Sequence, residues 1–447
     1  MRILIAGAGE VGTHLAKLLS QESHDITIMD ENPENLEFAY NDGLEIMTFV
    51  GLPTSLKDLN AAGAGMADLF IGVTPEESSN IVACILATKM GAKQTLARVN
   101  NSEYLQPENR AFLKDLGVDD MIYPEALAAK QITDSLSLPW SKQYWKFFDG
   151  KLVLVAARVI KDSPLIGKKL VDLSSLDQKF FHIVAIVRNS HTIIPRGQDI
   201  IERDDVLFAT ATPKHLHLVR EYCGQEDIKL KRVIIMGGSR IAVKTSQSLP
   251  NDLNIKIIEK DYEKCRKLSA IVPDNTLIIH GDGRNPDLLI DEGIKKTQAF
   301  LALTGTSESN MMATINAKRL GVPLSVAQIE NLDYLDIANE MKIGNLINKK
   351  LITAAVIFRY LLNVDVSDAK TLSIGQGEVL EIHVREHSRV TSAEVKDLHI
   401  PIGVTFGGLR RGEKVLLVEG STRIKAGDTV MIFTDRSNAK EINNLFS

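Results

Sequence analysis

A glycine-rich turn between two apolar strands constrains this chain more than any other feature. The apolar run Arg2–Ala6 enters a G-x-G-x-x-G turn, Gly7–Gly12, and helical spacing of leucines predicts a helix over Val11–Gln21. A second apolar strand, Ile26–Asp30, ends in an acid 18 residues after Gly12. Strand, glycine turn, helix, strand and terminal acid follow in the order that is typical of a dinucleotide-binding βαβ unit.

The residue types of the turn suit a loop that holds phosphates. Gly7 permits the tight turn, Gly9 lets the backbone approach a pyrophosphate, and Gly12 lets the helix lie close to the strand. The first helical turn then offers N–H groups and the positive end of the helix dipole. The candidate binding residues of the turn are Gly7, Ala8, Gly9, Glu10 and Val11.

Asp30 is placed to accept hydrogen bonds from ribose hydroxyls. It is followed by Glu31 and Asn32, without an arginine, which argues against a 2′-phosphate at this site. NAD, ATP and ADP carry the same adenosine ribose, so the residues alone leave all three open.

Alternating strand and helix patterns continue to about residue 140. Strands are expected at 45–50, 68–74, 94–99 and 121–123, with helices between them. This alternation predicts an α/β fold, a Rossmann-like doubly wound parallel sheet. Ligands of such sheets bind beyond the carboxyl ends of the strands, where Thr74 and Arg98 are expected to face the crevice. Arg98 could pair with a phosphate, and a surface salt bridge is the alternative.

The pattern changes from about Lys151 to a small β-rich α+β module that ends near Gly224. A hairpin is expected over 183–194, with its turn at Asn189 and Ser190, and a further strand over 205–208. His182 and His191 flank this hairpin and are expected at the surface.

The chain then repeats itself. A constant offset of 230 residues over about a hundred residues indicates an internal duplication. The β-rich module also recurs, because 205–208 resembles 428–431 and a turn at Arg411-Gly412 answers the first hairpin turn. We therefore predict four domains, at 1–140, 141–225, 230–363 and 364–447. The matched pairs are Gly7 with Gly237, Gly51 with Gly281, Thr74 with Thr304, and Asn80 with Asn310.

The second glycine turn departs from the first. Ser239 replaces Gly9 and is expected to crowd the pyrophosphate position, and Ala242 replaces Gly12, which the motif tolerates. Gln328 replaces Arg98 and loses a charge, whereas Arg240 replaces Glu10 and adds one. Glu259 keeps an acid for the ribose, one residue out of register. A working site and a purely structural copy both remain open for this half.

Bulk composition excludes several classes of protein. The formal net charge of −5 and the lack of a basic block give no support for nucleic-acid binding. Three cysteines lie far apart, which fits a reducing cytoplasm and neither a disulfide framework nor a zinc site. No apolar run reaches the roughly 18 residues of a membrane span, so any membrane role is expected through a partner. No hydride-transfer constellation accompanies the sheets, which points to nucleotide sensing without catalysis.

These motifs together resemble the TrkA family, the cytosolic regulatory subunits of bacterial Trk potassium transporters, which are built from RCK (regulator of potassium conductance) domains. The resemblance covers the full length, as tandem TrkA-N, TrkA-C, TrkA-N and TrkA-C modules. The chain departs from the family pattern where Leu52, not an acid, follows Gly51, although Asp282 keeps the acid in the second half. The motifs are Gly7–Gly12, Asp30, the run 73–77, Asn80 and the run 97–99, with their second-half echoes.

The resemblance implies regulatory binding of NAD(H) and ATP or ADP, and assembly of copies into a homo-oligomeric gating ring. It also implies docking on the inner face of the cell membrane, on an integral-membrane potassium channel subunit of the TrkH or TrkG type. An NAD-dependent oxidoreductase and a nucleotide-binding scaffold for another partner are the alternatives. On the family pattern the nucleotide contacts fall on Gly7 to Val11, Asp30, Val73, Thr74 and Arg98, and on Gly237, Gly238, Ser239, Arg240, Ile241, Glu259, Leu303, Thr304 and Gln328.

Overall fold

The computed structural model describes residues 1–20, 24–41, 44–173, 180–189, 191–361, 365–371, 377–434 and 439–446. The chain forms two compact units. One comprises Met1–Leu127 and Ile352–Leu361, and the other comprises Ala128–Leu351 and Leu362–Ser447. The predicted domain boundaries at 140, 225 and 363 remain predictions.

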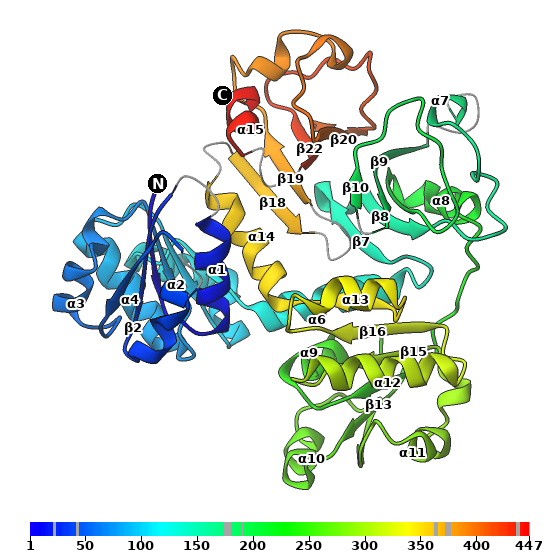
Figure 1. Ribbon diagram of the computed structural model, residues 1–447, viewed down its shortest axis with the longest axis horizontal. Helices are drawn as coiled ribbons and strands as arrows, with labels where there is room; N and C mark the ends of the chain where they lie inside the picture. Colours follow the sequence, from blue (N-terminus) through cyan, green and yellow to red (C-terminus); the bar gives the residue numbers. More distant parts are fainter. Residues whose placement is uncertain are drawn as a thin grey trace. The chain divides into compact units, whose positions relative to one another are not determined.

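The first unit contains a six-stranded parallel sheet flanked by helices (Figure 1). Its strand order is β3-β2-β1-β4-β5-β6, so the order reverses between β1 and β4. The central strands are buried on both faces, which explains their unbroken apolar sequences. The strands are β1 (Arg2–Ala6), β2 (Asp25–Asp30), β3 (Ile46–Val50), β4 (Leu69–Gly72), β5 (Thr95–Arg98) and β6 (Asp120–Ile122). The helices are α1 (Glu10–Leu19), α2 (Glu37–Asn41), α3 (Leu56–Ala61), α4 (Glu77–Met90) and α5 (Pro107–Leu116), and α6 (Pro124–Ser137) begins in this unit and continues into the second from Ala128.

The second unit contains a parallel sheet of the same order, β14-β13-β12-β15-β16-β17. The predicted pair of Rossmann-like sheets is therefore confirmed. The strands are β12 (Arg232–Met236), β13 (Asn254–Glu259), β14 (Thr276–His280), β15 (Ala299–Ala302), β16 (Leu324–Gln328) and β17 (Asn345–Ile347). The helices are α9 (Arg240–Ser248), α10 (Tyr262–Ser269), α11 (Pro286–Asp291), α12 (Ser307–Arg319) and α13 (Tyr334–Glu340), and α14 (Lys349–Leu361) begins in this unit and belongs to the first from Ile352 onward.

Strand register places the two predicted ribose acids at equivalent positions. Met29 is the last residue of β2 that pairs with β1, and Ile258 is the last residue of β13 that pairs with β12. Asp30 and Glu259 each follow directly. The offset between the two halves changes by one residue before β2 and β13 begin. The two acids therefore hold the same position in their sheets.

Each parallel sheet is followed in sequence by a small antiparallel sheet, as predicted. The first has the order β10-β9-β11-β8-β7 and the second β18-β19-β22-β20-β21. The predicted hairpin is present as β9 and β10; Ser190 of its turn lies outside the described residues. The first module has β7 (Gln143–Phe147), β8 (Leu152–Arg158), α7 (Leu170–Leu173), β9 (Phe181–Arg188), β10 (His191–Ile193), β11 (Val206–Ala211) and α8 (Leu216–Tyr222). The second has β18 (Asp365–Thr371), β19 (Glu378–His383), β20 (Val404–Arg411), β21 (Lys414–Leu416), β22 (Thr429–Thr434) and α15 (Ala439–Phe446).

A bidentate ion pair recurs in both small modules. In the first, Arg188 donates to both carboxylate oxygens of Asp205, each at 2.8 Å. In the second, Arg411 donates to both oxygens of Asp428, at 2.8 and 2.7 Å. Both aspartates are buried and precede the strand that the sequence comparison matched. The same contact at matched positions supports duplication of this module as well.

The two small sheets share one hydrophobic core within the second unit. Phe208 of β11 and Phe433 of β22 are both buried, with ring centroids 6.3 Å apart. Thr210 Oγ1 donates a buried hydrogen bond of 2.8 Å to the carbonyl of Gly407. Apolar residues of both sheets are therefore buried against each other, and this burial stabilises the packing of the two sheets.

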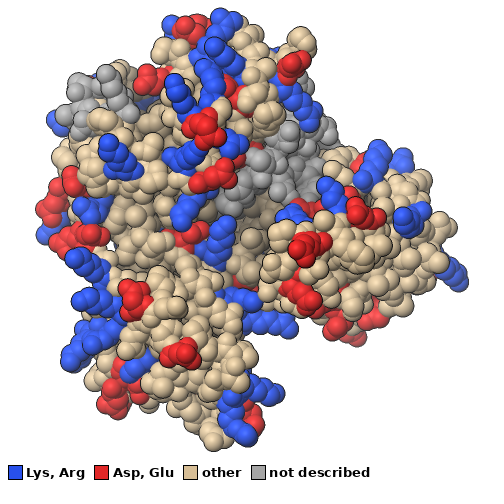
Figure 2. All heavy atoms as spheres, turned by 180° about the vertical axis from the view of Figure 1, so that it is seen from behind, with Lys and Arg blue, Asp and Glu red and all other residues tan. Residues whose placement is uncertain are grey.

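Acidic and basic side chains are intermingled over the face that Figure 2 shows. This agrees with the near balance of 52 Lys and Arg against 57 Asp and Glu. Among the described residues, no helix combines the length and the apolar composition that crossing a membrane requires. Within the same residues, no group of three or more His, Cys, Asp or Glu side chains is placed to hold a metal ion.

Candidate nucleotide-binding sites

The first glycine turn connects β1 to α1 at the point where the strand order reverses. Gly7 has a φ of +108°, a backbone conformation that residues with a side chain rarely adopt. A Cβ at Gly12 would lie 1.8 Å from the carbonyl oxygen of Gly7, whereas a Cβ at Gly9 would meet no atom within 4 Å. Gly9 precedes α1 and makes no side-chain cap. The geometry agrees with a close helix–strand approach at Gly12 and an open face at Gly9.

The Asp30 carboxylate is hydrogen-bonded to this turn. Its Oδ2 accepts from the N–H of Ala8 at 2.7 Å, and its Oδ1 accepts from the N–H of Asn32 at 2.9 Å and from Asn35 Nδ2 at 3.0 Å. A carboxylate offers about four acceptor positions, so capacity remains for a ribose hydroxyl. Asp30 therefore fixes the position of Ala8 in addition to any contact with a ligand.

A buried asparagine fastens the ends of β4 and β5 together. Asn80 Oδ1 accepts from the N–H of Thr74 at 2.8 Å, and Asn80 Nδ2 donates to the carbonyls of Thr74 at 3.0 Å and Arg98 at 2.9 Å. Val73, which precedes Thr74, is buried. The repeat comparison singled out Asn80 but did not show its role, which is to position two predicted ligand contacts.

The Arg98 side chain takes part in an ion pair that the sequence analysis missed. Its guanidinium lies 3.4 Å from Oε1 of Glu125, at the start of α6, and their side chains are only 19% and 8% exposed. This is a largely buried pair and not the surface salt bridge considered as the alternative. Arg98 Nε and Glu125 Oε2 are buried and have no hydrogen-bond partner among the described residues. Each group therefore keeps unused bonding capacity.

The second glycine turn keeps the first turn's shape with different side chains. Gly237 has a φ of +95°, and a Cβ at Gly238 would lie 2.2 Å from Leu268 Cδ1. Ser239 Oγ accepts from the N–H of Ala242 at 3.3 Å and so caps α9. The Ser239 hydroxyl thus occupies one N–H donor of the helix terminus, and the crowding of a pyrophosphate by this residue stays a prediction.

Glu259 repeats the contacts of Asp30. Its Oε2 accepts from the N–H of Gly238 at 2.8 Å, and its Oε1 accepts from the N–H of Asp261 at 3.0 Å. In addition, the ammonium of Lys264 lies 2.9 Å from Oε2. Burial favours a higher pKa for Glu259, but Lys264 and the two N–H groups outweigh it and hold the pKa below its usual range.

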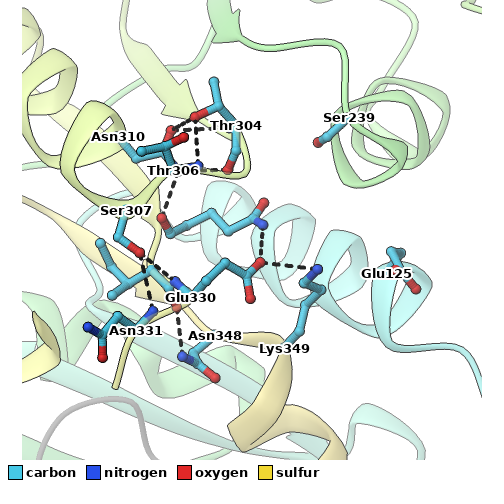
Figure 3. A network of polar contacts seen from close by, with 12 residues as sticks. Glu125, Ser239, Thr304, Thr306, Ser307, Asn310, Glu330, Asn331, Asn348 and Lys349 are labelled. Carbon is cyan, nitrogen blue, oxygen red and sulfur yellow. Dashed lines mark hydrogen bonds and ion pairs between the residues drawn. The ribbon is translucent and has the colours of Figure 1, made fainter. Parts of the chain in front are cut away.

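Figure 3 shows the polar network at the ends of β15 and β16. Asn310 accepts from the N–H of Thr304 at 3.1 Å and donates to the carbonyl of Gln328 at 2.7 Å, as Asn80 does in the first half. The Gln328 side chain donates to Glu330, whose Oε1 lies 3.1 Å from Lys349 at the start of α14. The ion pair between strand end and helix start thus has the opposite polarity from the Arg98–Glu125 pair.

A cavity of about 240 Å³ lies beside the second glycine turn. It brings together most of the residues predicted for this half, namely Gly237, Gly238, Ser239, Glu259, Leu303 and Thr304. Arg240, Ile241 and Gln328 do not line it. The cavity is also lined by four charged residues that the prediction omitted, Lys260, Lys264, Asp282 and Arg284. The sequence analysis named Asp282 as the family's acid in this half, and a position-by-position comparison of the two halves would also have singled out the three cations.

Comparisons with known proteins agree with this architecture. The family model for the TrkA-N domain matches residues 3–124 and 233–349, and that for the TrkA-C domain matches 154–224 and 379–447. The chain is 30% identical to the Trk system potassium uptake protein TrkA of Haemophilus influenzae and 31% identical to that of Vibrio alginolyticus. Each alignment covers 100% of this chain and 98% of the relative.

Solved structures with the same fold include the GsuK RCK domain, with a TM-score of 0.62 and 14% identity. That match covers 100% of this chain and 94% of the other. A GsuK channel described as bound to NAD matches with a TM-score of 0.61 and 14% identity, over 100% of this chain and 78% of the other. At these identities the likeness concerns the fold.

Proposed function

The chain belongs to the TrkA family of Trk system potassium uptake proteins, and from that premise we propose that it is a nucleotide-binding regulatory subunit. In this proposal, copies of the chain assemble into a ring on the inner face of the cell membrane. The ring docks on an integral-membrane potassium channel subunit of the TrkH or TrkG type and gates it. The chain performs no catalytic step.

One observation carries the proposal: the acid at the end of the second strand hydrogen-bonds the glycine turn in both halves. Asp30 accepts from Ala8 at 2.7 Å, and Glu259 accepts from Gly238 at 2.8 Å. A carboxylate so held presents its remaining lone pairs beside the glycine turn, where the acid of such folds binds the ribose of a dinucleotide. The proposed ligands are NAD(H), ATP and ADP, and the NAD described in the GsuK channel supports this choice.

The two ion pairs each join a strand end at a nucleotide site to a helix. They therefore provide a route by which nucleotide binding changes the rest of the ring. Arg98 connects the end of β5 to α6 through Glu125, and Glu330 connects the end of β16 to α14 through Lys349. A terminal phosphate that binds Arg98 must share it with Glu125, which changes the forces on α6. A ligand shifts such an equilibrium only by its differential affinity for the two ring shapes, typically by about 1–3 kcal/mol.

Potassium flux tests the proposal. The chain is added to vesicles that contain the partner channel, with ATP, ADP, NADH or no nucleotide. We expect flux to require the chain and to differ between nucleotides, and Asp30→Ala to blunt that difference. Flux that is the same with every nucleotide would contradict the proposed function. Asp25→Ala, which removes an exposed acid at the opposite end of β2, is the matched control.

A further inference from the structure

The two candidate sites share their backbone contacts but differ in charge around the ribose acid. Asn35 of the first half and Lys264 of the second occupy equivalent places, five residues after the acid. Asn35 Nδ2 lies 3.0 Å from Asp30, and Lys264 Nζ lies 2.9 Å from Glu259. A neutral amide in the first site is thus an ammonium in the second, in the same position.

Two further substitutions add positive charge on the same side. Glu31, directly after the first acid, is answered by Lys260, which is exposed and lines the second cavity. Thr54, three residues after Gly51, is answered by Arg284, which follows the matching Gly281 and also lines the cavity. All three cations of the second site therefore line one cavity together with the predicted ribose acid, Glu259, and the matched positions of the first site carry no cation.

Arg284 and Lys264 each form an ion pair with a carboxylate, and both pairs are exposed enough to be replaced by a stronger anion. Arg284 makes a bidentate ion pair with Asp282, with Nη2–Oδ2 at 2.6 Å and Nε–Oδ1 at 3.0 Å. Both side chains are about half exposed, at 55% and 44%. Lys264 is 45% exposed while its partner Glu259 keeps two backbone N–H contacts. Solvent-exposed pairs contribute little stability, so a stronger anion can draw these cations to itself.

We infer that the second site selects an adenosine ligand that carries a phosphate monoester on its ribose, whereas the first selects an unsubstituted ribose. This rests on the proposed function, in which both halves bind adenosine ligands. A phosphate monoester carries nearly two negative charges at neutral pH. Lys260, Lys264 and Arg284 supply charge-assisted donors for it, and an arginine beside the acid is the feature that accommodates a 2′-phosphate in this type of fold. Even with Glu259 and Asp282 in the cavity, the three cations leave the second site net positive, whereas Asp30 and Glu31 leave the first site net negative, so that it repels such a group.

Extra phosphate on the 5′ side is a different ligand chemistry, and the charges favour it less. The cation on the glycine-turn side of the second half is Arg240, which is exposed and does not line the cavity. The three cations that line it lie beside the ribose acid and at the end of β14. The second site therefore selects its ligand by where the phosphate is attached to the adenosine more than by the number of phosphates.

Three isomers that each carry two phosphates test this inference. Calorimetry on the full chain carrying Asp30→Ala, which weakens the first site, compares adenosine 2′,5′-bisphosphate, adenosine 3′,5′-bisphosphate and ADP. We expect one of the bisphosphates to bind about 10-fold or more tightly than ADP. The isomer that binds better tells whether the natural source is a 2′- or a 3′-phosphorylated adenosine.

A transplant of first-site residues provides the decisive variant. Lys260→Glu, Lys264→Asn and Arg284→Thr, added together to Asp30→Ala, should abolish the preference while ADP binding persists. Lys267→Asn, an exposed change in the same helix outside the cavity, should leave the preference intact. Equal affinities for the isomers, or a preference that survives the transplant, would overturn the inference.

Competition on the unmutated chain keeps the test independent of Asp30→Ala. We expect a bisphosphate to fill a site from which excess NAD does not displace it. If NAD binds the unmutated chain but no bisphosphate is preferred, this inference falls and the proposed function stands. If no adenosine ligand binds the unmutated chain, both fall.

Discussion

The guanidinium of Arg98, at the end of β5, lies 3.4 Å from the carboxylate of Glu125, at the start of α6, and both side chains are largely buried. A phosphate that is to bind Arg98 must therefore compete with a carboxylate of the protein. Arg98 Nε has no partner among the described residues, so the guanidinium can gain a second anion before it gives up the first. If Arg98 binds a terminal phosphate as proposed, Glu125 therefore limits the affinity for that phosphate.

Substitution of either partner should separate ATP from NAD. Arg98→Ala should weaken ATP and ADP by about 10-fold and NAD much less, because a charge-assisted contact to a terminal phosphate contributes roughly 1.5–3 kcal/mol. Glu125→Gln should strengthen ATP, since the competing charge is gone. Calorimetry on both variants measures this, with Lys93→Ala, which breaks the exposed Lys93–Asp68 pair, as the control. Equal losses for ATP and NAD in Arg98→Ala would refute the assigned role.

Asp30→Ala should weaken every adenosine ligand of the first site. The variant loses a ribose acceptor and also releases the N–H of Ala8, which Asp30 holds at 2.7 Å. We expect dissociation constants for NAD, ATP and ADP to rise together by about 10- to 100-fold. Titration of each ligand checks this, and Asp25→Ala, which removes an exposed acid at the opposite end of β2, should bind as the unmutated chain does. Selective loss of one ligand would show that Asp30 does not contact the shared ribose.

The two glycine turns should respond differently to reverse exchanges at matched positions. In the first, Gly12→Ala forces a Cβ to 1.8 Å from the carbonyl of Gly7, so backbone must move, at a cost of about 1–3 kcal/mol. In the second, Ala242→Gly removes a methyl group that the turn already accommodates. We expect Gly12→Ala to impair NAD binding and Ala242→Gly to leave it intact. Comparable binding by both variants would mean that the first turn is not held as tightly as its geometry indicates.

Much of the fold and of the site could be predicted because the signals are local or periodic. Unbroken apolar runs identify parallel strands, and the repeat offset identifies the second copy. The acids Asp30 and Glu259 follow directly from their strands. Glu125 could not be found in this way, because its contact with Arg98 joins residues 27 positions apart and depends on where α6 begins. Lys260, Lys264 and Arg284 read as ordinary surface cations until the structure places them around one cavity.

His182 shows the same limit. The sequence placed it at the surface beside a hairpin, but in β9 it is half-buried, whereas His191 is exposed as expected. One imidazole in a strand that is apolar on both faces does not reveal how far it is buried. Burial lowers the pKa of His182 to about 4, so the folded chain keeps this imidazole neutral under conditions in which a free histidine is charged.

The lowered pKa makes the first small module sensitive to mild acid. An unfolded histidine has a pKa of about 6.5, so below that pH the unfolded chain takes up a proton that folded His182 refuses. Stability from this residue is therefore unaffected above pH 6.5 and lost as the pH falls toward 4, by about 2 kcal/mol at pH 5. Denaturant unfolding followed by tryptophan fluorescence reports this region, because both tryptophans of the chain, Trp140 and Trp145, lie in or beside β7. Unfolding free energies at pH 7 and pH 5 should differ less in His182→Gln than in the unmutated chain, whereas His191→Gln should change nothing. An unchanged pH dependence in His182→Gln would place the acid sensitivity of this module elsewhere.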